Sequence, residues 1–288
     1  MQLTASNRTL AISKQFQAHH LLGLVGTQIK ENTKVGHSMR PIKDGAHQMI
    51  SFGIQEGKYT NKSTGCALLF RAPFQLKHMH NIAVPSKESG LRGRAGAVTF
   101  LCRDLRVKII LAYFPPQPWK SGTTKKALQI WHQTTQALLA WISDEWNTTP
   151  HRTVPYILTD LNSQLGQSQE GVGEFASGAP NNTGHRMREW MIAHHAAALN
   201  TFFDAGPTLV NKDGQKQIDF IIAPQSAVRF VENAAHFHAA LKECRPPPTW
   251  WTTSALALRL TTQRATTVTG SATDTTGTFY PPSSSTGT

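Results

Sequence analysis

The stretch Tyr156-Ile157-Leu158-Thr159-Asp160-Leu161-Asn162-Ser163-Gln164-Leu165-Gly166 predicts a buried strand that ends on an acidic residue. Its apolar start is short and follows a proline, as is typical of an interior strand. Asp160 and Asn162 stand two residues apart, so both side chains face the same way if the strand continues. This pair suits a reaction centre, because an acid can take a proton from water while an amide positions an oxyanion. The alternative is that both residues only shape a turn.

The composition predicts a polyanionic partner. The chain has 288 residues, 29 Lys and Arg against 17 Asp and Glu, and a formal net charge of +12. Such a basic surface attracts polyanions, nucleic acid first among them, although it also serves solubility. With 39% hydrophobic residues, the chain is long enough for one large core or two small ones.

The cysteine content and the lengths of the apolar runs indicate the cellular compartment in which we expect the chain. Cys66, Cys102 and Cys244 are far apart and show no paired metal spacing. A sparse, odd set favours an intracellular, reducing compartment, the nucleus included, over a disulfide or zinc scaffold. No apolar run approaches the length of a membrane span, and the first residues show no secretion signal.

Apolar periodicity predicts one α/β domain over residues 1–243. Residues 244–288 are rich in Pro and then in Thr, Ser and Gly, so we expect a disordered tail. Residues 30–50 are expected to be irregular. Helices are predicted at 11–20, 125–146 and 182–198, and strands at 1–10, 21–26, 50–54, 67–70, 97–101, 107–114, 156–160, 200–203, 217–222 and 227–231.

The order of several short pieces resembles the endonuclease/exonuclease/phosphatase superfamily, and within it most closely the endonuclease domains of LINE-type retrotransposons. The resemblance implies a four-layer αββα sandwich of two packed mixed β-sheets flanked by helices. The pieces that carry it are Thr4–Leu10 (a first strand ending in Asn), Leu22–Gln28 ("L-Q-E-T"), Gly65–Arg71, Ile109–Pro116 ("Y-x-P-P"), Leu158–Gly166 ("G-D-F-N-x-x-x-G"), Ile218–Ile221 ("I-D-Y-I") and His238 (the last residue of "S-D-H").

The resemblance implies metal-assisted phosphodiester hydrolysis, with Mg²⁺ as the usual ion and Mn²⁺ as a substitute. By this resemblance Asp160 activates water and Asn162 holds the phosphate. Asp219 would fix the tautomer of His238, which faces the phosphate. Tyr113 would lean toward the phosphate. For Tyr113 the alternative is ordinary strand packing, and for His238 it is a surface position.

Two acids of the family pattern are missing. Gly26 stands where the family has its metal-binding glutamate, and Phe237 stands where it has an aspartate. A hard dication prefers charged oxygen ligands, so metal binding should be weaker. The implied ligands that remain are Asp160 and Asn7, with Glu56 as a substitute carboxylate. The alternative for Glu56 is a solvated loop acid.

Three functions follow from these expectations. The first is a Mg²⁺-dependent DNA endonuclease of retroelement origin, in which Arg8, Asn61 and Asn162 contact phosphate. The second is a catalytically inactive relative that keeps the fold and binds nucleic acid. The third is a phosphatase for a small phosphoester, which the high positive charge fits less well.

Overall fold

The structure is a computed structural model that describes most of the chain between residues 19 and 230 and short pieces outside it. No helix in this part of the chain is long and apolar enough to cross a membrane. The described residues are 13–14, 19–31, 35–55, 64–102, 105–118, 123–167, 170–211, 214–230 and 254–258.

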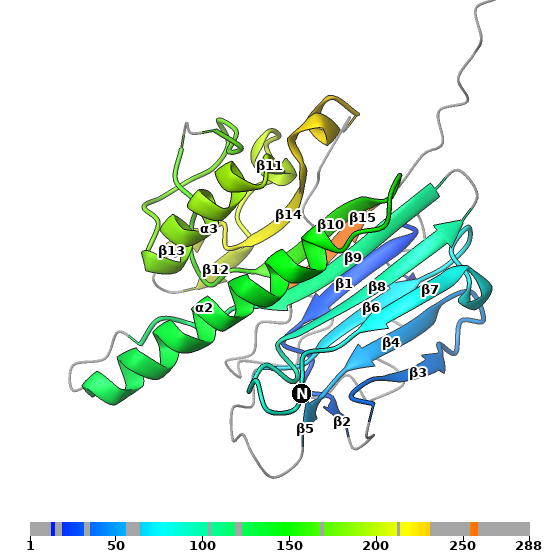
Figure 1. The fold of residues 1–288 in the computed structure, drawn as a ribbon. Helices are drawn as coiled ribbons and strands as arrows, with labels where there is room; N and C mark the ends of the chain where they lie inside the picture. The colour runs from blue at the N-terminus through cyan, green and yellow to red at the C-terminus, as the bar shows by residue number, and fades with distance from the viewer. Residues whose placement is uncertain are drawn as a thin grey trace, which may run out of the picture.

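A five-stranded sheet forms one layer (Figure 1). Its strand order is β15-β1-β6-β4-β3, and every neighbouring pair is antiparallel. It was expected to be mixed, and the expectation is wrong for this sheet. The strands are β1 (Leu21–Val25), β3 (Ser38–Pro41), β4 (Gln48–Phe52), β6 (Cys66–Phe70) and β15 (Ser254–Leu258).

A six-stranded sheet packs against the first and is mixed, as expected. Its order is β11-β14-β10-β9-β8-β7, and its one parallel pair is β9 with β10. A parallel pair needs a long crossover, and the helix α2 (Lys125–Asn147) supplies it. The strands are β7 (Met79–Ala83), β8 (Ala95–Cys102), β9 (Leu105–Tyr113), β10 (Val154–Asp160), β11 (Ala196–Ala198) and β14 (Asp219–Pro224).

The remaining elements lie outside the two large sheets. A second long helix, α3 (Asn182–Ala193), precedes β11. The other elements are β2 (Lys30–Glu31) paired with β5 (Ile54–Gln55), β12 (Leu209–Asn211) paired with β13 (Gly214–Lys216), and the 3₁₀ turns η1 (Leu76–His78), η2 (Leu199–Thr201) and η3 (Gln225–Phe230).

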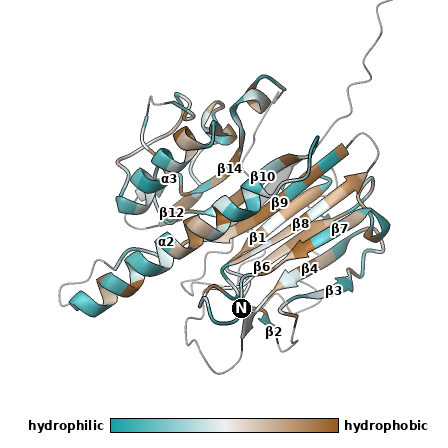
Figure 2. Ribbon diagram, viewed as in Figure 1, coloured by the Kyte–Doolittle hydropathy of each residue, from teal (hydrophilic) through white to brown (hydrophobic). Residues whose placement is uncertain are grey.

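The main core lies between the two sheets, where strands of both are apolar (Figure 2). Leu111 and Leu158 of the six-stranded sheet belong to this core and are fully buried. Gly23 of β1 lets the sheets approach closely, because a Cβ there would lie 2.6 Å from Cδ1 of Leu158. The register of these strands is therefore set by the contact between sheets.

A second core lies between the six-stranded sheet and the helices α2 and α3. Leu138 and Ile142 of α2 are buried there. Lys108, a buried cation on β9, contacts the C-terminal turn of α2. Its Nζ lies 2.7 Å from the Glu145 carboxylate and donates to Thr148 Oγ1 at 3.2 Å. It also donates to the Glu145 carbonyl, so a strand residue satisfies the last turn of α2.

The expected sandwich is confirmed, with local corrections. Residues 30–50 hold β3 and the start of β4 instead of being irregular. The helix predicted over 182–198 ends at Ala193, because His195 has a φ of 48° that stops helical hydrogen bonding. Residues 200–203 and 227–231, predicted as strands, fall largely in 3₁₀ turns.

The described residues near both ends of the chain can be compared with the predictions for residues 1–20 and 244–288. Within the helix predicted over 11–20, Ser13 and Lys14 are helical whereas His19 and His20 are not. The predicted strand at 1–10 lies outside the described residues. β15 lies beyond residue 243, so part of the predicted tail is an edge strand that pairs with all five residues of β1.

We predict that a chain ending at residue 243 is less stable than one ending at residue 260. The shorter chain lacks β15 and exposes the edge of β1, so its melting temperature should be lower by roughly 5 °C or more. Thermal unfolding of both chains by circular dichroism measures this difference. Equal melting temperatures would mean that β15 contributes nothing to the fold.

Candidate functional site

Two aspartates meet at one end of the six-stranded sheet. Asp160 is the last residue of β10 and Asp219 is the first residue of β14. They are direct partners in the antiparallel register, with exposed fractions of 2% and 0%. The sequence singled out both residues separately, and the structure brings them together.

Their closeness changes the chemistry of Asp160. Burial raises the pKa of its carboxyl well above the usual range, and the negative charge of Asp219 raises it further. The backbone N–H of Asn162, which donates to Asp160 Oδ1 at 2.9 Å, lowers it. A carboxyl with a raised pKa can gain or release a proton closer to neutrality than an ordinary aspartate.

Asn162 is held rigidly beside Asp160. Its φ is 49°, a left-handed conformation that asparagine adopts more readily than most residues. Its Nδ2 donates to the Phe114 carbonyl at 2.8 Å, and its own carbonyl accepts from Asn181 Nδ2 at 3.3 Å. The turn that was considered as the alternative is therefore present, and it fixes the direction of the Asn162 amide.

Polar side chains that sequence reasoning missed support Asp219. Thr208 Oγ1 accepts the backbone N–H groups of Ile218 and Asp219 at 2.9 and 3.1 Å. Asn200 Nδ2 donates to the Asp219 carbonyl at 3.0 Å, and its Oδ1 accepts the Ile221 N–H at 3.0 Å. All of these contacts are buried, and no motif in the sequence links Thr208 or Asn200 to β14.

Tyr113 and an unpredicted arginine border the aspartates. Tyr113 ends β9 in register with Asp160 and is buried. The Arg94 guanidinium lies 5.6 Å from the centre of the Tyr113 ring, and Arg94 and Tyr113 also bond through their backbones. Burial raises the pKa of the Cys66 thiol to about 12, with Arg94 lowering it and Asp160 raising it. Arg94 is thus a cation that contacts Tyr113 and acts on the Cys66 thiol, which also senses the charge of Asp160.

The end of β1 offers no carboxylate. Gly26 follows β1 with a φ of 72°, which an L-residue such as glutamate rarely adopts. The next residue, Thr27, donates its N–H to the Gly65 carbonyl at 2.9 Å. The backbone at this place therefore suits glycine and disfavours the family's metal-binding acid.

Part of the predicted site lies outside the described residues: Asn7, Arg8, Glu56, Asn61, Phe237 and His238. Within the described part of the chain, no group of three or more His, Cys, Asp or Glu side chains could hold a metal ion. The described site is a carboxylate pair with an amide, a tyrosine and an arginine around it.

Solved structures share this architecture. A 3′-5′ exonuclease from Neisseria meningitidis matches with a TM-score of 0.59 and 11% identity, over 90% of this chain and 98% of that one. A 3′ phosphatase from Neisseria bound to a product DNA hairpin matches with a TM-score of 0.57 and 10% identity, over 90% and 96%. An AP endonuclease from Leishmania major matches with a TM-score of 0.57 and 12% identity, over 88% and 83%.

The fold is the one that these exonuclease, phosphatase and AP endonuclease structures share. No protein-family model matches the sequence, and no curated protein matches it by sequence comparison. The likeness is therefore one of structure at low identity, and it shows the fold alone.

We predict that Asp160→Asn stabilises the protein at pH 7. Between the pKa of an unfolded aspartate, about 4, and the raised folded pKa, the folded state binds more protons than the unfolded state. The contribution of Asp160 to the free energy of unfolding therefore falls as the pH rises from the unfolded pKa to the raised folded pKa. Asparagine removes the buried charge and keeps an acceptor for the Asn162 N–H.

The measurement is the urea midpoint at several pH values between 4 and 7. The advantage of Asp160→Asn should shrink toward pH 4, and Asp144→Asn, at an exposed position on α2, is the matched control. A variant that is less stable than the parent at every pH would contradict the assignment of a raised pKa.

Proposed function

We propose that the chain hydrolyses a phosphate ester of nucleic acid at the Asp160 end of β10. The observation that carries the proposal is the pair of buried, directly paired carboxylates beside an asparagine held in place by hydrogen bonds. Structures of the same fold are named exonuclease, phosphatase and AP endonuclease, which supports this reaction class.

Asp160 is the group proposed to take the proton of the attacking water. Its raised pKa makes it a better base than an ordinary carboxylate, and the Asp219 charge disfavours the state in which both are ionised. Asn162 has two amide N–H groups, of which one is given to Phe114. The other is proposed to donate to a phosphate oxygen and so to stabilise its developing charge.

Mg²⁺ or Mn²⁺ is the proposed cofactor. The two carboxylates fit it, because Mg²⁺ is bound through one or two carboxylates together with water and substrate phosphates, and a dication relieves the repulsion between two acids. Asp160 and Asp219 would hold it, and it would supply positive charge to the phosphate. Gly26 adds no ligand, so weak binding is expected until substrate is present.

DNA is the proposed substrate, and the domain is proposed to be of retroelement origin. The net charge of +12 supports a polyanion. Arg8 and Asn61 as phosphate contacts, and His238 as the partner of Asp219, remain part of this proposal. An intracellular, reducing compartment is proposed with it, and the described cysteines, Cys66 and Cys102, are free and buried, which is compatible with it.

A second candidate is an inactive relative that binds nucleic acid through the same fold. Gly26, in its left-handed conformation, favours this second candidate, because glycine leaves the site without one expected metal ligand. A small-molecule phosphatase is the remaining alternative.

We predict that the protein nicks supercoiled plasmid with Mg²⁺ or Mn²⁺ and that Asp160→Asn lowers the rate at least about 100-fold, since a general base contributes that much or more. Asp219→Asn should lower it to a smaller extent. Conversion of supercoiled to relaxed plasmid on agarose gels measures the rate, with EDTA as the metal control.

The alternatives give other results. Plasmid retention at low salt without nicking, in the parent and Asp160→Asn alike, would support the inactive binder. Hydrolysis of p-nitrophenyl phosphate without nicking would support the phosphatase. Nicking that is unchanged in Asp160→Asn would remove Asp160 from the site.

A further inference from the structure

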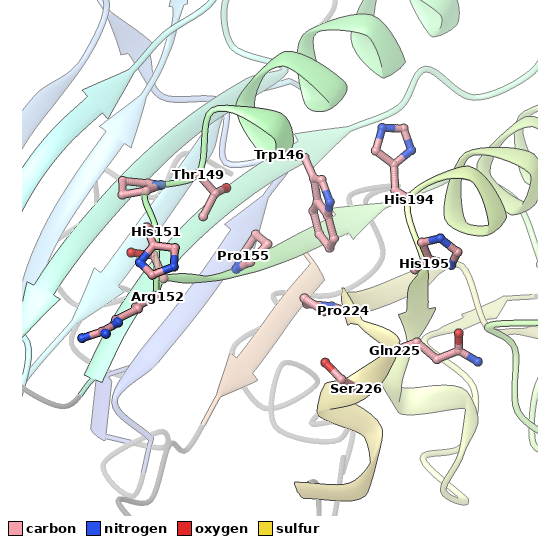
Figure 3. Close-up of a pocket in the computed structure, with 12 residues that line it drawn as sticks. Trp146, Thr149, His151, Arg152, Pro155, His194, His195, Pro224, Gln225 and Ser226 are labelled. Carbon is pink, nitrogen blue, oxygen red and sulfur yellow. The ribbon is translucent and has the colours of Figure 1, made fainter.

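A cavity lies at the opposite end of β10 from the candidate site. Its volume is about 720 Å³, and Pro155 at the start of β10 lines it (Figure 3). Asp160 is five residues further along the strand, roughly 17 Å away. The cavity therefore belongs to another face of the molecule, and the proposed hydrolysis makes no use of it.

The cavity is lined for an anion. Its lining includes Arg152, His151, His194 and His195, and it includes no aspartate or glutamate. His194 Nδ1 already donates to the Trp190 carbonyl at 2.9 Å, so Arg152, His151 and His195 are the donors for an anion. Arg152 is always charged, and neutral imidazoles can still donate a hydrogen bond. Phosphate is the commonest biological group that matches such a set of donors.

Two of these side chains stand at backbone positions that favour glycine. Arg152 has a φ of 59° as the third residue of a turn closed by the Thr153 N–H and the Pro150 carbonyl, at 3.0 Å. His195 has a φ of 48° just after α3, where glycine is the usual residue. Both positions line one cavity, and each carries a basic side chain where glycine would be unstrained.

The indole of Trp146 lies between two pairs of basic side chains. Trp146, near the end of α2, stands between the loop of His151 and Arg152 and the segment of His194 and His195 (Figure 3). It packs edge-on against Trp190 with centroids 5.2 Å apart, and Trp190 donates to Ser143 Oγ at 2.8 Å. Trp146 remains partly exposed, so an anchored aromatic ring faces a cationic cavity.

We propose that this cavity binds single-stranded nucleic acid. A base stacks on Trp146 while the adjoining phosphates lie against Arg152 and His195, which is how aromatic and basic side chains together hold single strands. Duplex DNA keeps its bases stacked on one another and cannot use the indole. Binding here does not depend on the proposed hydrolysis, and it is measured in EDTA, where that reaction is suppressed.

The test uses the full chain and a fluorescein-labelled oligothymidylate of eight nucleotides. The double variant Arg152→Gly/His195→Gly removes both side chains at positions where glycine is unstrained, so the fold is retained, which its melting temperature checks. Fluorescence anisotropy at low salt should show binding weakened at least about tenfold. Lys43→Ala removes an exposed charge between β3 and β4, outside the cavity lining, and should leave binding unchanged.

A second measurement reports on stacking. Oligothymidylate should quench tryptophan fluorescence in the parent protein, and Trp146→Phe should lose that quenching while retaining binding within about threefold, since phenylalanine also stacks on bases. Undiminished binding in the double variant, or quenching that persists without Trp146, would overturn the proposal. The proposal would also be overturned if the double variant lost as much affinity for a duplex of the same length as for the single strand. Displacement of the oligonucleotide by polyglutamate of equal charge would overturn it too, because either result would mean that charge alone is recognised.

Discussion

The buried pair of Asp160 and Asp219 is the constraint on which this end of the molecule depends. Two carboxylates side by side in an apolar core repel one another and lose hydration, and both effects raise the pKa of Asp160. A fold keeps such a pair only when the surrounding backbone holds it firmly. The cross-strand register of β10 and β14 does so, because it places the two residues directly opposite each other.

The neighbouring polar groups follow from that constraint. Thr208 and Asn200 bond the backbone around Asp219, so the start of β14 is tied to the segments that precede it in the chain. Asn162 contributes its backbone N–H to Asp160 and its amide to the strand end before α2. These are neutral donors and acceptors, which stabilise the backbone without relieving the negative charge. Arg94 places a positive charge against the Tyr113 ring, next to the strand end that carries Asp160.

The two ends of β10 differ in chemistry. One end holds two buried aspartates, and the other carries a cavity lined by an arginine, three histidines and an indole. The left-handed residue at each end, Asn162 or Arg152, sits where the chain turns out of the sheet. The turns at the two ends of β10 thus set the directions of the Asn162 and Arg152 side chains, while the length of the strand sets the distance between them.

The sequence alone determined the strands that carry strong apolar patterns, the helix α2 and, by resemblance, the sandwich class, and it singled out Asp160, Asn162 and Asp219 as candidate site residues. It could not show that Asp160 and Asp219 are direct neighbours, because strand register depends on packing between sheets. It also could not reveal Arg94, Thr208, Asn200 or the Trp146 cavity, whose members are distant in the chain. β15 was missed because its short apolar run, Ala255–Leu258, lies between polar, Thr-rich stretches, and the strand forms where β1 offers free backbone groups. Local pattern decides which elements form, and tertiary contact decides which side chains meet.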